Sequence, residues 1–179
     1  MLNILKASPA DASLLTKISR EIYQEHYLHL WHPGGATWYM ETYAYANDNI
    51  KNDLEDPLIE YYIVAEGGNC LGYLKLIINA SLSTEPLKEA LEVERIYLYK
   101  SATGKGHGKK IMEFAKQRAM ELSKKIIFLK AMDSSLNAIA FYEKMGYQVC
   151  STLQLPLPTF ILMKKDYRGM LILQQHLNN

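Results

Sequence analysis

The stretch TGKGHGKK, residues 103–110, places three glycines at alternate positions among cationic side chains. The apolar-periodic run IMEFAKQRAMEL follows directly and predicts a helix that ends near Ser123. A loop that gives up side chains can bring backbone N–H groups close to a ligand, and where a helix begins those groups attract an anion. The stretch therefore predicts a phosphate-binding turn between a strand and a helix.

Strands are predicted on both sides of this turn and its helix. The run LEVERIYLY, residues 91–99, leads into the glycines, and IIFLKA, residues 126–131, follows the helix. A strand, a helix and a second strand in this order form one βαβ unit, whose two strands are parallel. Upstream, YYIVAE and CLGYLKLIIN flank Gly67, Gly68 and Asn69, which is the signature of an antiparallel hairpin.

The two ends of the chain add the remaining elements. NILKA, residues 3–7, predicts a first strand, and Ser8 with Asp11 predicts the capped start of a helix that runs to about Tyr27. Near the other end, NAIAFYEKM predicts a helix that ends at Gly146, and YQVCSTLQL and TFILMKK predict two final strands. This order predicts an α/β fold, with a mixed, mostly antiparallel sheet of about seven strands and helices on both faces.

Length and composition favour one domain over residues 1–179 and exclude several classes of protein. Lysine and arginine number 20 and aspartate and glutamate 19, so no basic field argues for bulk binding of nucleic acid. No apolar run is long enough to cross a bilayer, and nothing at the N-terminus resembles a signal peptide. The cysteines are Cys70 and Cys150, and we expect them to be free thiols in a cytoplasmic protein.

Three phosphate-binding motifs compete for the glycine loop. The P-loop pattern requires a hydroxyl after its lysine, but Lys110 follows Lys109. The dinucleotide fingerprint requires a third glycine where Lys109 stands. The coenzyme A loop, Q/R-x-x-G-x-G/A, matches the spacing of Gly106 and Gly108. We therefore expect the loop to hold coenzyme A.

Several motifs together resemble the GNAT superfamily of acetyl-CoA-dependent N-acetyltransferases. VERIYLYK, the glycine loop, KKIMEFAKQRA, IIFLKA and AIAFYEKMGY follow the order and spacing of that family over residues 60–165. The combination of ERIYL with AIAFYEKMGY is most similar to the polyamine-type (spermidine/spermine) members. The resemblance implies the fold of this family and acetyl-CoA as cosubstrate.

The resemblance also assigns residues to the cofactor. Backbone groups of residues 96–98 would pair with the pantetheine arm, and the N–H groups of residues 104–109 would hold the pyrophosphate with the help of the helix dipole. Two positions depart from the family. Thr103 replaces a glutamine or arginine, and Ser135 replaces an asparagine, so either Ser135 or the nearby Asn137 would contact the pantetheine. The full expected set is Ile96, Tyr97, Leu98, Thr103, Gly104, Lys105, Gly106, His107, Gly108, Lys109, Ser135, Asn137 and Tyr142.

Acetyl transfer requires a neutral amine, whereas a free alkyl ammonium has a pKa of about 10.4. A base must therefore take a proton, directly or through water. The resemblance places this carboxylate at Glu92, and Glu94 shares its strand parity; the alternative is that both are solvated strand residues. The resemblance gives the protonation of the departing thiolate to Tyr142, whose phenol carries its proton at neutral pH; the alternative is a core tyrosine.

The tract LHLWHPGGATWYMETY, residues 28–43, is rich in aromatic side chains. In the resembling family this segment lines the acceptor cleft, so Trp31, Trp38 and Tyr39 are expected to hold an ammonium by cation–π contact. The alternative is a packed aromatic cluster that braces the helices, or a dimer contact. The three histidines of H-x-x-H-x-x-H advance by about 300° each on a helix and do not converge, so no metal site is expected.

Together these observations predict an N-acetyltransferase that moves the acetyl group of acetyl-CoA to a primary amine by direct attack in a ternary complex. The expected acceptor is a small polyamine-like molecule, with a protein or peptide amine as the alternative. A different class of function is a domain that binds acyl-CoA without turnover and regulates a partner. The apolar C-terminal run MLILQQHL suggests either packing or a subunit contact in a homodimer.

Overall fold

The computed structural model describes residues 1–82 and 89–177, which contain one seven-stranded sheet. The strand order is β1-β2-β3-β4-β5-β7-β6, with β4 and β5 parallel and every other neighbouring pair antiparallel. The predicted mixed, mostly antiparallel sheet is thereby confirmed. The strands are β1 (Leu2–Lys6), β2 (Ile59–Glu66), β3 (Asn69–Ile77), β4 (Ala90–Leu98), β5 (Ile126–Met132), β6 (Gln148–Gln154) and β7 (Gly169–His176).

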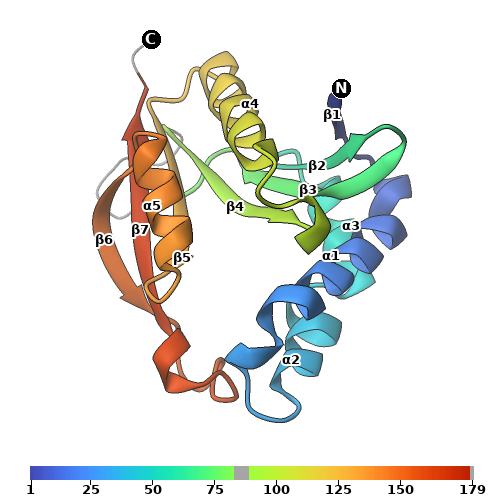
Figure 1. The fold of residues 1–179 in the computed structure, drawn as a ribbon, viewed down its shortest axis with the longest axis vertical. Coiled ribbons are helices and arrows are strands. Elements are labelled where there is room, and N and C mark those ends of the chain that lie inside the picture. Colours follow the sequence, from blue (N-terminus) through green and yellow to red (C-terminus); the bar gives the residue numbers. More distant parts are fainter. Residues whose placement is uncertain (83–88, 178–179) are drawn as a thin grey trace.

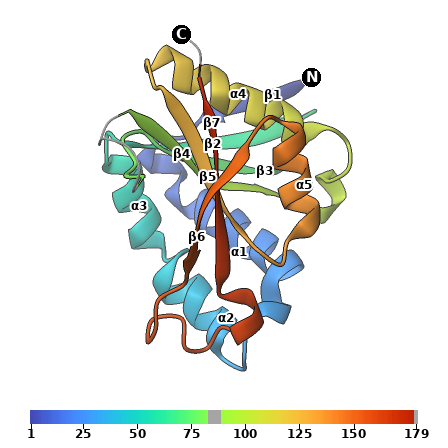
Figure 2. The ribbon, with the colours of Figure 1, turned by 90° about the vertical axis from the view of Figure 1, so that its left-hand side faces the viewer.

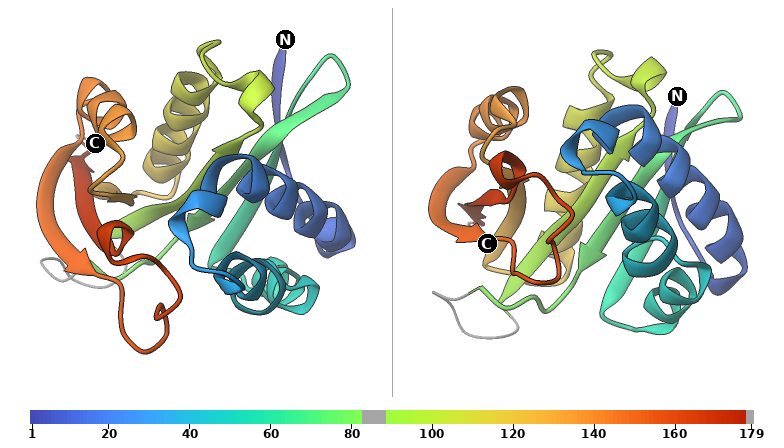
Figure 3. Two further views of the ribbon diagram at one scale, coloured as in Figure 1. Left: turned by 60° about the horizontal axis from the view of Figure 1, so that its bottom comes forward. Right: turned by 90° about the horizontal axis from the view of Figure 1, so that it is seen from below.

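Helices cover both faces of the sheet, as predicted (Figure 1, Figure 3). On the face covered by α4 and α5, Ile111 and Leu129 belong to one buried apolar cluster. On the opposite face, covered by α1, α2 and α3, Leu15 and Tyr61 belong to a second cluster. Among the described residues, none of the helices combines the length and the apolar character that a membrane span requires. The helices are α1 (Ala12–Tyr27), α2 (Gly35–Trp38), α3 (Asn47–Glu55), α4 (His107–Glu121) and α5 (Leu136–Lys144).

The local signals for the first helix and for the hairpin are confirmed. The Ser8 N–H donates to the Asp11 carboxylate at 2.8 Å and closes the predicted capping box before α1. Gly67 and Gly68 join β2 to β3 with φ of +58° and +81°, conformations that glycine adopts without steric cost. Both signals act over a few residues, so the sequence reveals them directly.

Strand β4 contains one residue more than its partner β3 requires. Lys75 lies opposite Arg95, but Leu76 lies opposite Val93, so Glu94 is the extra residue of a β-bulge. The side chains of Glu94 and Arg95 consequently lie on the α1 face. Ile96 and Leu98, which share the sequence parity of Glu94, instead pack against the cluster on the α4 face.

The parallel strands β4 and β5 pair over only part of their length. Register partners extend from Ala90 with Ile126 to Val93 with Leu129, and beyond Val93 the two strands separate. Figure 1 shows this divergence between β4 and β5. The remainder of β4 therefore presents unpaired backbone groups to a gap inside the sheet.

The predicted strand TFILMKK is wrong. Residues 157–162 form consecutive turns, in which the Phe160 N–H donates to the Pro156 carbonyl and the Ile161 N–H to the Pro158 carbonyl. An isolated bridge joins Met163 to Trp31, and a 3₁₀ helix begins at Lys165. The last strand is β7, which lies between β5 and β6, so MLILQQHL packs within the chain. The segment that joins β6 to β7 lies beside α2 (Figure 2).

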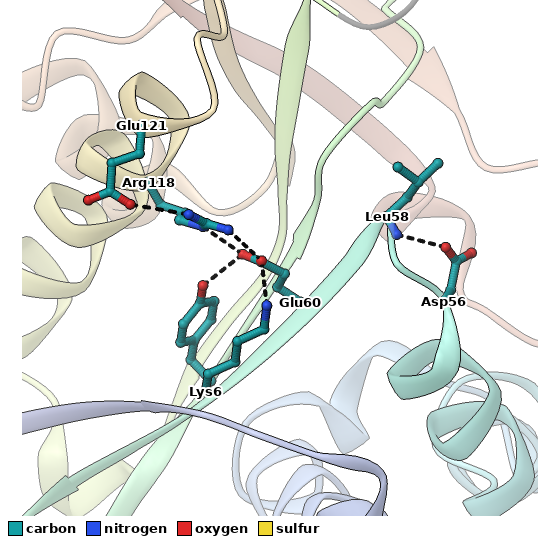
Figure 4. Close-up of polar contacts among 7 residues, drawn as sticks. Lys6, Asp56, Leu58, Glu60, Arg118 and Glu121 are labelled. Carbon is teal, nitrogen blue, oxygen red and sulfur yellow. Dashed lines mark hydrogen bonds and ion pairs between the residues drawn. The ribbon is translucent and has the colours of Figure 1, made fainter.

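A buried carboxylate joins β1, β2 and α4. Glu60 on β2 is 3% exposed and accepts hydrogen bonds from Lys6 at 2.6 Å, from Arg118 at 2.8 and 2.9 Å, and from the Tyr62 hydroxyl at 2.7 Å (Figure 4). Burial alone would raise the pKa of Glu60, but the hydrogen bonds from Arg118, Lys6 and Tyr62 outweigh it and lower this pKa to about 2. Arg118 also contacts the exposed Glu121 on the same helix. Because Arg118 lies on α4 and donates to Glu60 on β2, the C-terminal half of α4 is fixed to the sheet.

Candidate active site

The gap beside β4 opens into a cleft of about 180 Å³. The Tyr99 N–H donates to the Leu71 carbonyl at 2.9 Å, which directs the backbone groups of Tyr99 toward β3. Because an antiparallel strand alternates, the N–H and C=O groups of Ile96 and Leu98 are directed away from β3 and into the gap. Tyr97 pairs with β3 through its backbone. The cleft is lined by His26, Tyr27, Ile96, Tyr97, Leu98, Thr103, Gly108, Phe141 and Tyr142.

The glycine loop forms the turn that the sequence predicted. Gly104 and Gly106 have φ of +73° and +80°, and Gly106 is the N-cap of α4. The Thr103 hydroxyl donates to the Lys100 carbonyl at 2.8 Å and closes the turn before the loop. Because α4 begins after Gly106, its first N–H groups lack the carbonyl partners that a preceding helical turn would supply. An anion at this end of the helix can accept hydrogen bonds from them.

The backbone of the glycine loop, more than its side chains, is placed to contact an anion at the start of α4. Lys105 is exposed, and Lys109 is 66% exposed with its ammonium 3.8 Å from Glu113. His107 is 7% exposed, and its Nε2 lies 3.9 Å from the Glu66 carboxylate. The imidazole is therefore buried beneath the loop, and only the backbone of His107 belongs to the N-terminus of α4.

Tyr142 on α5 lies where two cavities meet. It lines both the cleft beside β4 and a second cavity of about 220 Å³, which also share Tyr27, Ile96 and Tyr97. Burial, with a smaller contribution from Tyr27, raises the pKa of Tyr142 above its ordinary value. The phenol is therefore protonated at neutral pH and can donate a proton at this junction.

The structure separates the two candidates before α5. Ser135 is the N-cap residue of α5 and lines the second cavity, although its hydroxyl makes no capping hydrogen bond. Asn137 is exposed in the first turn of α5, away from the residues that line either cavity in the described part of the chain. Ser135 is the better placed of the two to contact a ligand.

Glu94 and Glu92 occupy different positions. Glu94 lines the second cavity, and its carboxylate lies 2.6 Å from the Lys75 ammonium and 3.2 Å from the Arg95 guanidinium. Burial alone would raise the pKa of Glu94, but Arg95 and Lys75 outweigh it and hold this pKa below its ordinary value. Glu92 is 6% exposed and contacts the Lys130 ammonium at 2.9 Å, and Lys130 itself lines the cavity.

A carboxylate in the environment of Glu94 stays ionised at neutral pH. It can attract an ammonium, but a depressed pKa makes it a weak base toward an alkyl amine. A proton would leave such an amine more readily through water than by direct transfer. Glu92 is buried and Glu94 is partly buried, and each is paired with a cation.

The three aromatic side chains expected at the acceptor divide into two groups. Tyr39 lines the second cavity. Trp31 is 5% exposed, donates its indole N–H to the Tyr23 hydroxyl at 2.8 Å and packs edge-on against Trp38. Trp38 also packs against Phe160. Trp31 and Trp38 thus belong to a packed aromatic cluster and are not among the described residues that line the second cavity. A packed cluster was the alternative interpretation of this tract.

Several residues that line the cavities were not predicted to have a functional role. His26 on α1 donates from Nε2 to the Leu98 carbonyl at 3.0 Å, so α1 contacts the free edge of β4. The spacing of Tyr23 and Tyr27, four residues apart on a helix, was the available signal that both share a face. Leu155, Phe160, Met163 and Met170 enter from the C-terminal segment.

The histidines of H-x-x-H-x-x-H point to different surroundings. His26 contacts β4, whereas the His29 ring packs edge-on against Tyr167 at 5.5 Å. Within residues 1–82 and 89–177, no group of three or more histidine, cysteine, aspartate or glutamate side chains is arranged to hold a metal ion. Cys70 and Cys150 are free thiols.

Comparison with known proteins agrees with this geometry. The sequence model of the Acetyltransferase (GNAT) family matches residues 20–147. An uncharacterised N-acetyltransferase of the pepI 3′ region in Lactobacillus delbrueckii subsp. lactis is 30% identical over 143 residues, which cover 80% of this chain and 82% of that protein.

Solved structures share the fold. PaiA N-acetyltransferase from Thermoplasma acidophilum, in complex with coenzyme A, has a TM-score of 0.76 and 17% identity and covers 99% of both chains. A mutant of spermidine N-acetyltransferase SpeG from Vibrio cholerae has a TM-score of 0.69 and 14% identity, covering 98% of this chain and 93% of that one. At such identities the likeness concerns the fold alone.

Proposed function

Because the chain belongs to the acetyltransferase (GNAT) family and is an acetyl-CoA-dependent N-acetyltransferase, we propose that it acetylates the primary amine of a small molecule by direct attack in a ternary complex. One observation carries this proposal. The cleft beside β4 and the second cavity meet at Tyr27, Ile96, Tyr97 and Tyr142, so a thioester and an amine entering from opposite sides would meet there.

Each end of the coenzyme has a proposed place. The pantetheine amides pair with the backbone groups of Ile96 and with the N–H of Leu98, whose carbonyl already accepts from His26, as an added strand would. The pyrophosphate lies on the N–H groups of residues 104–109, where the dipole of α4 favours negative charge. Ser135 lies toward the junction and is the proposed side-chain contact of the pantetheine.

The proposed transfer uses two groups of the chain. The amine nitrogen attacks the thioester carbon, the C–N bond forms, and the C–S bond breaks with its electrons on sulfur. Tyr142 protonates the departing thiolate, and solvent restores its proton. Glu94 attracts the incoming ammonium, which loses one proton to water before the attack, and the acylated nitrogen loses a second proton to water afterwards. Glu92 acts indirectly, by pairing with Lys130.

The acceptor class follows from the second cavity. The Glu94 carboxylate and the aromatic faces of Tyr27 and Tyr39 can hold the ammonium of a small amine, of which a polyamine-like molecule is the acceptor that the sequence predicted. A protein or peptide amine is the second candidate.

We further propose that residues 1–179 are one domain acting in a reducing compartment such as the cytoplasm, which the free Cys70 and Cys150 support. The predicted homodimer is tested by the mass of the protein in solution.

Release of free thiol from acetyl-CoA tests the proposal. An amine-dependent signal is expected, and Tyr142→Phe should lower kcat by about 100-fold with little change in acetyl-CoA affinity. Tyr147→Phe is the matched control, because Tyr147 is also buried and lies 6.2 Å from the Tyr142 ring but lines neither cavity as described. Equal activity of both variants would remove Tyr142 from the mechanism. Binding of acetyl-CoA without thiol release for any amine would instead favour a regulatory binding domain.

A further inference from the structure

We propose that the preferred acceptor is a primary monoamine with an apolar or aromatic body, rather than a polyamine. This inference rests on the proposed function, since it concerns the molecule that the second cavity would take. It follows from the lining of that cavity and from the charges of the elements that enclose it.

Most of the side chains that line the second cavity are apolar or aromatic. Leu30, Leu155, Phe160, Met163 and Met170 line it, together with five tyrosines, three of them from α1 and the segment after it. Methionine and aromatic side chains adapt to an apolar guest and gain contact area from it. The polar groups among the described lining residues are neutral hydroxyls, the Glu94 carboxylate and the Lys130 ammonium, so a second ammonium of the acceptor has no carboxylate of its own.

Among the residues that the structure describes, Glu94 is the one carboxylate that lines the cavity. Glu94 lines it beside Val93 and Ile96, close to the junction with the cleft, so an ammonium held there is close to the thioester. Glu94 is already paired with Arg95 and with Lys75, which it shares with Asp53, so the carboxylate cannot balance the several ammonium groups of a polyamine. The body of the acceptor would then lie along the walls that Leu155, Phe160 and Met163 provide.

The other charged groups near the cavity offer no second free carboxylate in the described part of the chain. Lys130 lines the wall and is paired with Glu92, and the segment that contributes Met163 continues through Lys164 and Lys165 to Arg168, with Asp166 as its single acidic residue. A polyamine bound at Glu94 would place its other ammonium groups against apolar walls or near these cations. Burying an unpaired charge is costly, so each further ammonium weakens binding.

Thiol release with a panel of amines at pH 8 tests the inference. The probes are phenethylamine, hexylamine, spermidine and a short peptide with one free lysine. We expect kcat/KM for phenethylamine and hexylamine to exceed that for spermidine by about 10-fold or more, which is within the range that apolar pockets discriminate. A kcat/KM for spermidine or for the peptide that equals or exceeds both monoamines would overturn the inference while leaving the proposed function intact. Absence of thiol release with every amine would overturn both.

A charge added to the wall tests the same inference independently. Leu155→Glu places a second carboxylate in the cavity, and it should lower kcat/KM for phenethylamine and raise that for spermidine, each by about 10-fold. Leu157→Glu is the matched control, because Leu157 lies in the same segment, is 56% exposed and is absent from the lining of this cavity. An unchanged preference in Leu155→Glu, or an equal change in Leu157→Glu, would argue against the assigned wall. Leu155 is only half-buried, and should this variant fail to fold, the wild-type panel still decides.

Discussion

Replacing Glu60 by glutamine removes the carboxylate that joins β1, β2 and α4. The pKa of Glu60 falls from its ordinary value of 4.5 to about 2, and Glu60 is 3% exposed. Since one pKa unit corresponds to about 1.4 kcal/mol, the ionised carboxylate stabilises the folded state by about 3 kcal/mol at neutral pH. Because the folded pKa is depressed, this stabilisation is present above pH 4.5 and is lost as the pH falls toward 2.

Urea unfolding at pH 7 and pH 3 measures this contribution. At pH 7 the free energy of unfolding should fall by about 3 kcal/mol in Glu60→Gln, because Arg118 and Lys6 lose their buried partner. The difference between wild type and variant should shrink by about 2 kcal/mol at pH 3. Glu121→Gln is the matched control, because Glu121 contacts the same arginine but is 50% exposed, and it should cost less than about 1 kcal/mol. Equal costs for the two variants, or a cost for Glu60→Gln that does not change with pH, would refute the reasoning.

Three further predictions concern the site. Gly106→Ala and Gly67→Ala each place a side chain at positive φ in open space and should each cost about 1 kcal/mol of stability, but only Gly106→Ala should raise KM for acetyl-CoA. Equal KM values would exclude the loop from cofactor binding. Lys75→Met removes a cation that lowers the pKa of Glu94, so the acid limb of the kcat/KM profile should move to higher pH; an unmoved limb would show that Glu94 does not govern it. His26→Phe removes the donor to the edge of β4 and should raise KM for acetyl-CoA about fivefold at similar kcat, whereas His26→Gln, which retains a donor, should restore it. Failure of glutamine to restore KM would indicate a packing role.

Signals that act over a few residues allowed much of the fold to be predicted. The glycine loop, the hairpin and the capping box each depend on local backbone geometry, and all three occur as expected. The final strand could not be placed in this way. Residues 159–165 and 169–176 are both apolar runs, and which of them pairs depends on strands β5 and β6, far away along the chain.

The candidate site was predictable where the backbone forms it and less so where side chains do. Ile96 and Leu98 could be predicted as backbone contacts of the pantetheine, because the strand that contains them directly precedes the glycine loop. The burial of Trp31 and the accessibility of Tyr39 depend instead on how the short α2 segment turns against the segment after β6, which local periodicity does not encode. The orientation of Glu94 depends on a bulge whose position is set by pairing with β3.

The bulge in β4 has an evolutionary consequence. Leu91, Val93, Ile96 and Leu98 face one side of the sheet, and the residues between them face the other. If Glu94 were removed, this alternation would run unbroken, because Arg95 already lies opposite Lys75. The acid is thus an insertion whose gain or loss by one codon leaves every other side chain of the strand facing as before. Lineages sharing this scaffold can acquire or discard a negative charge in the lining of the second cavity in a single genetic step.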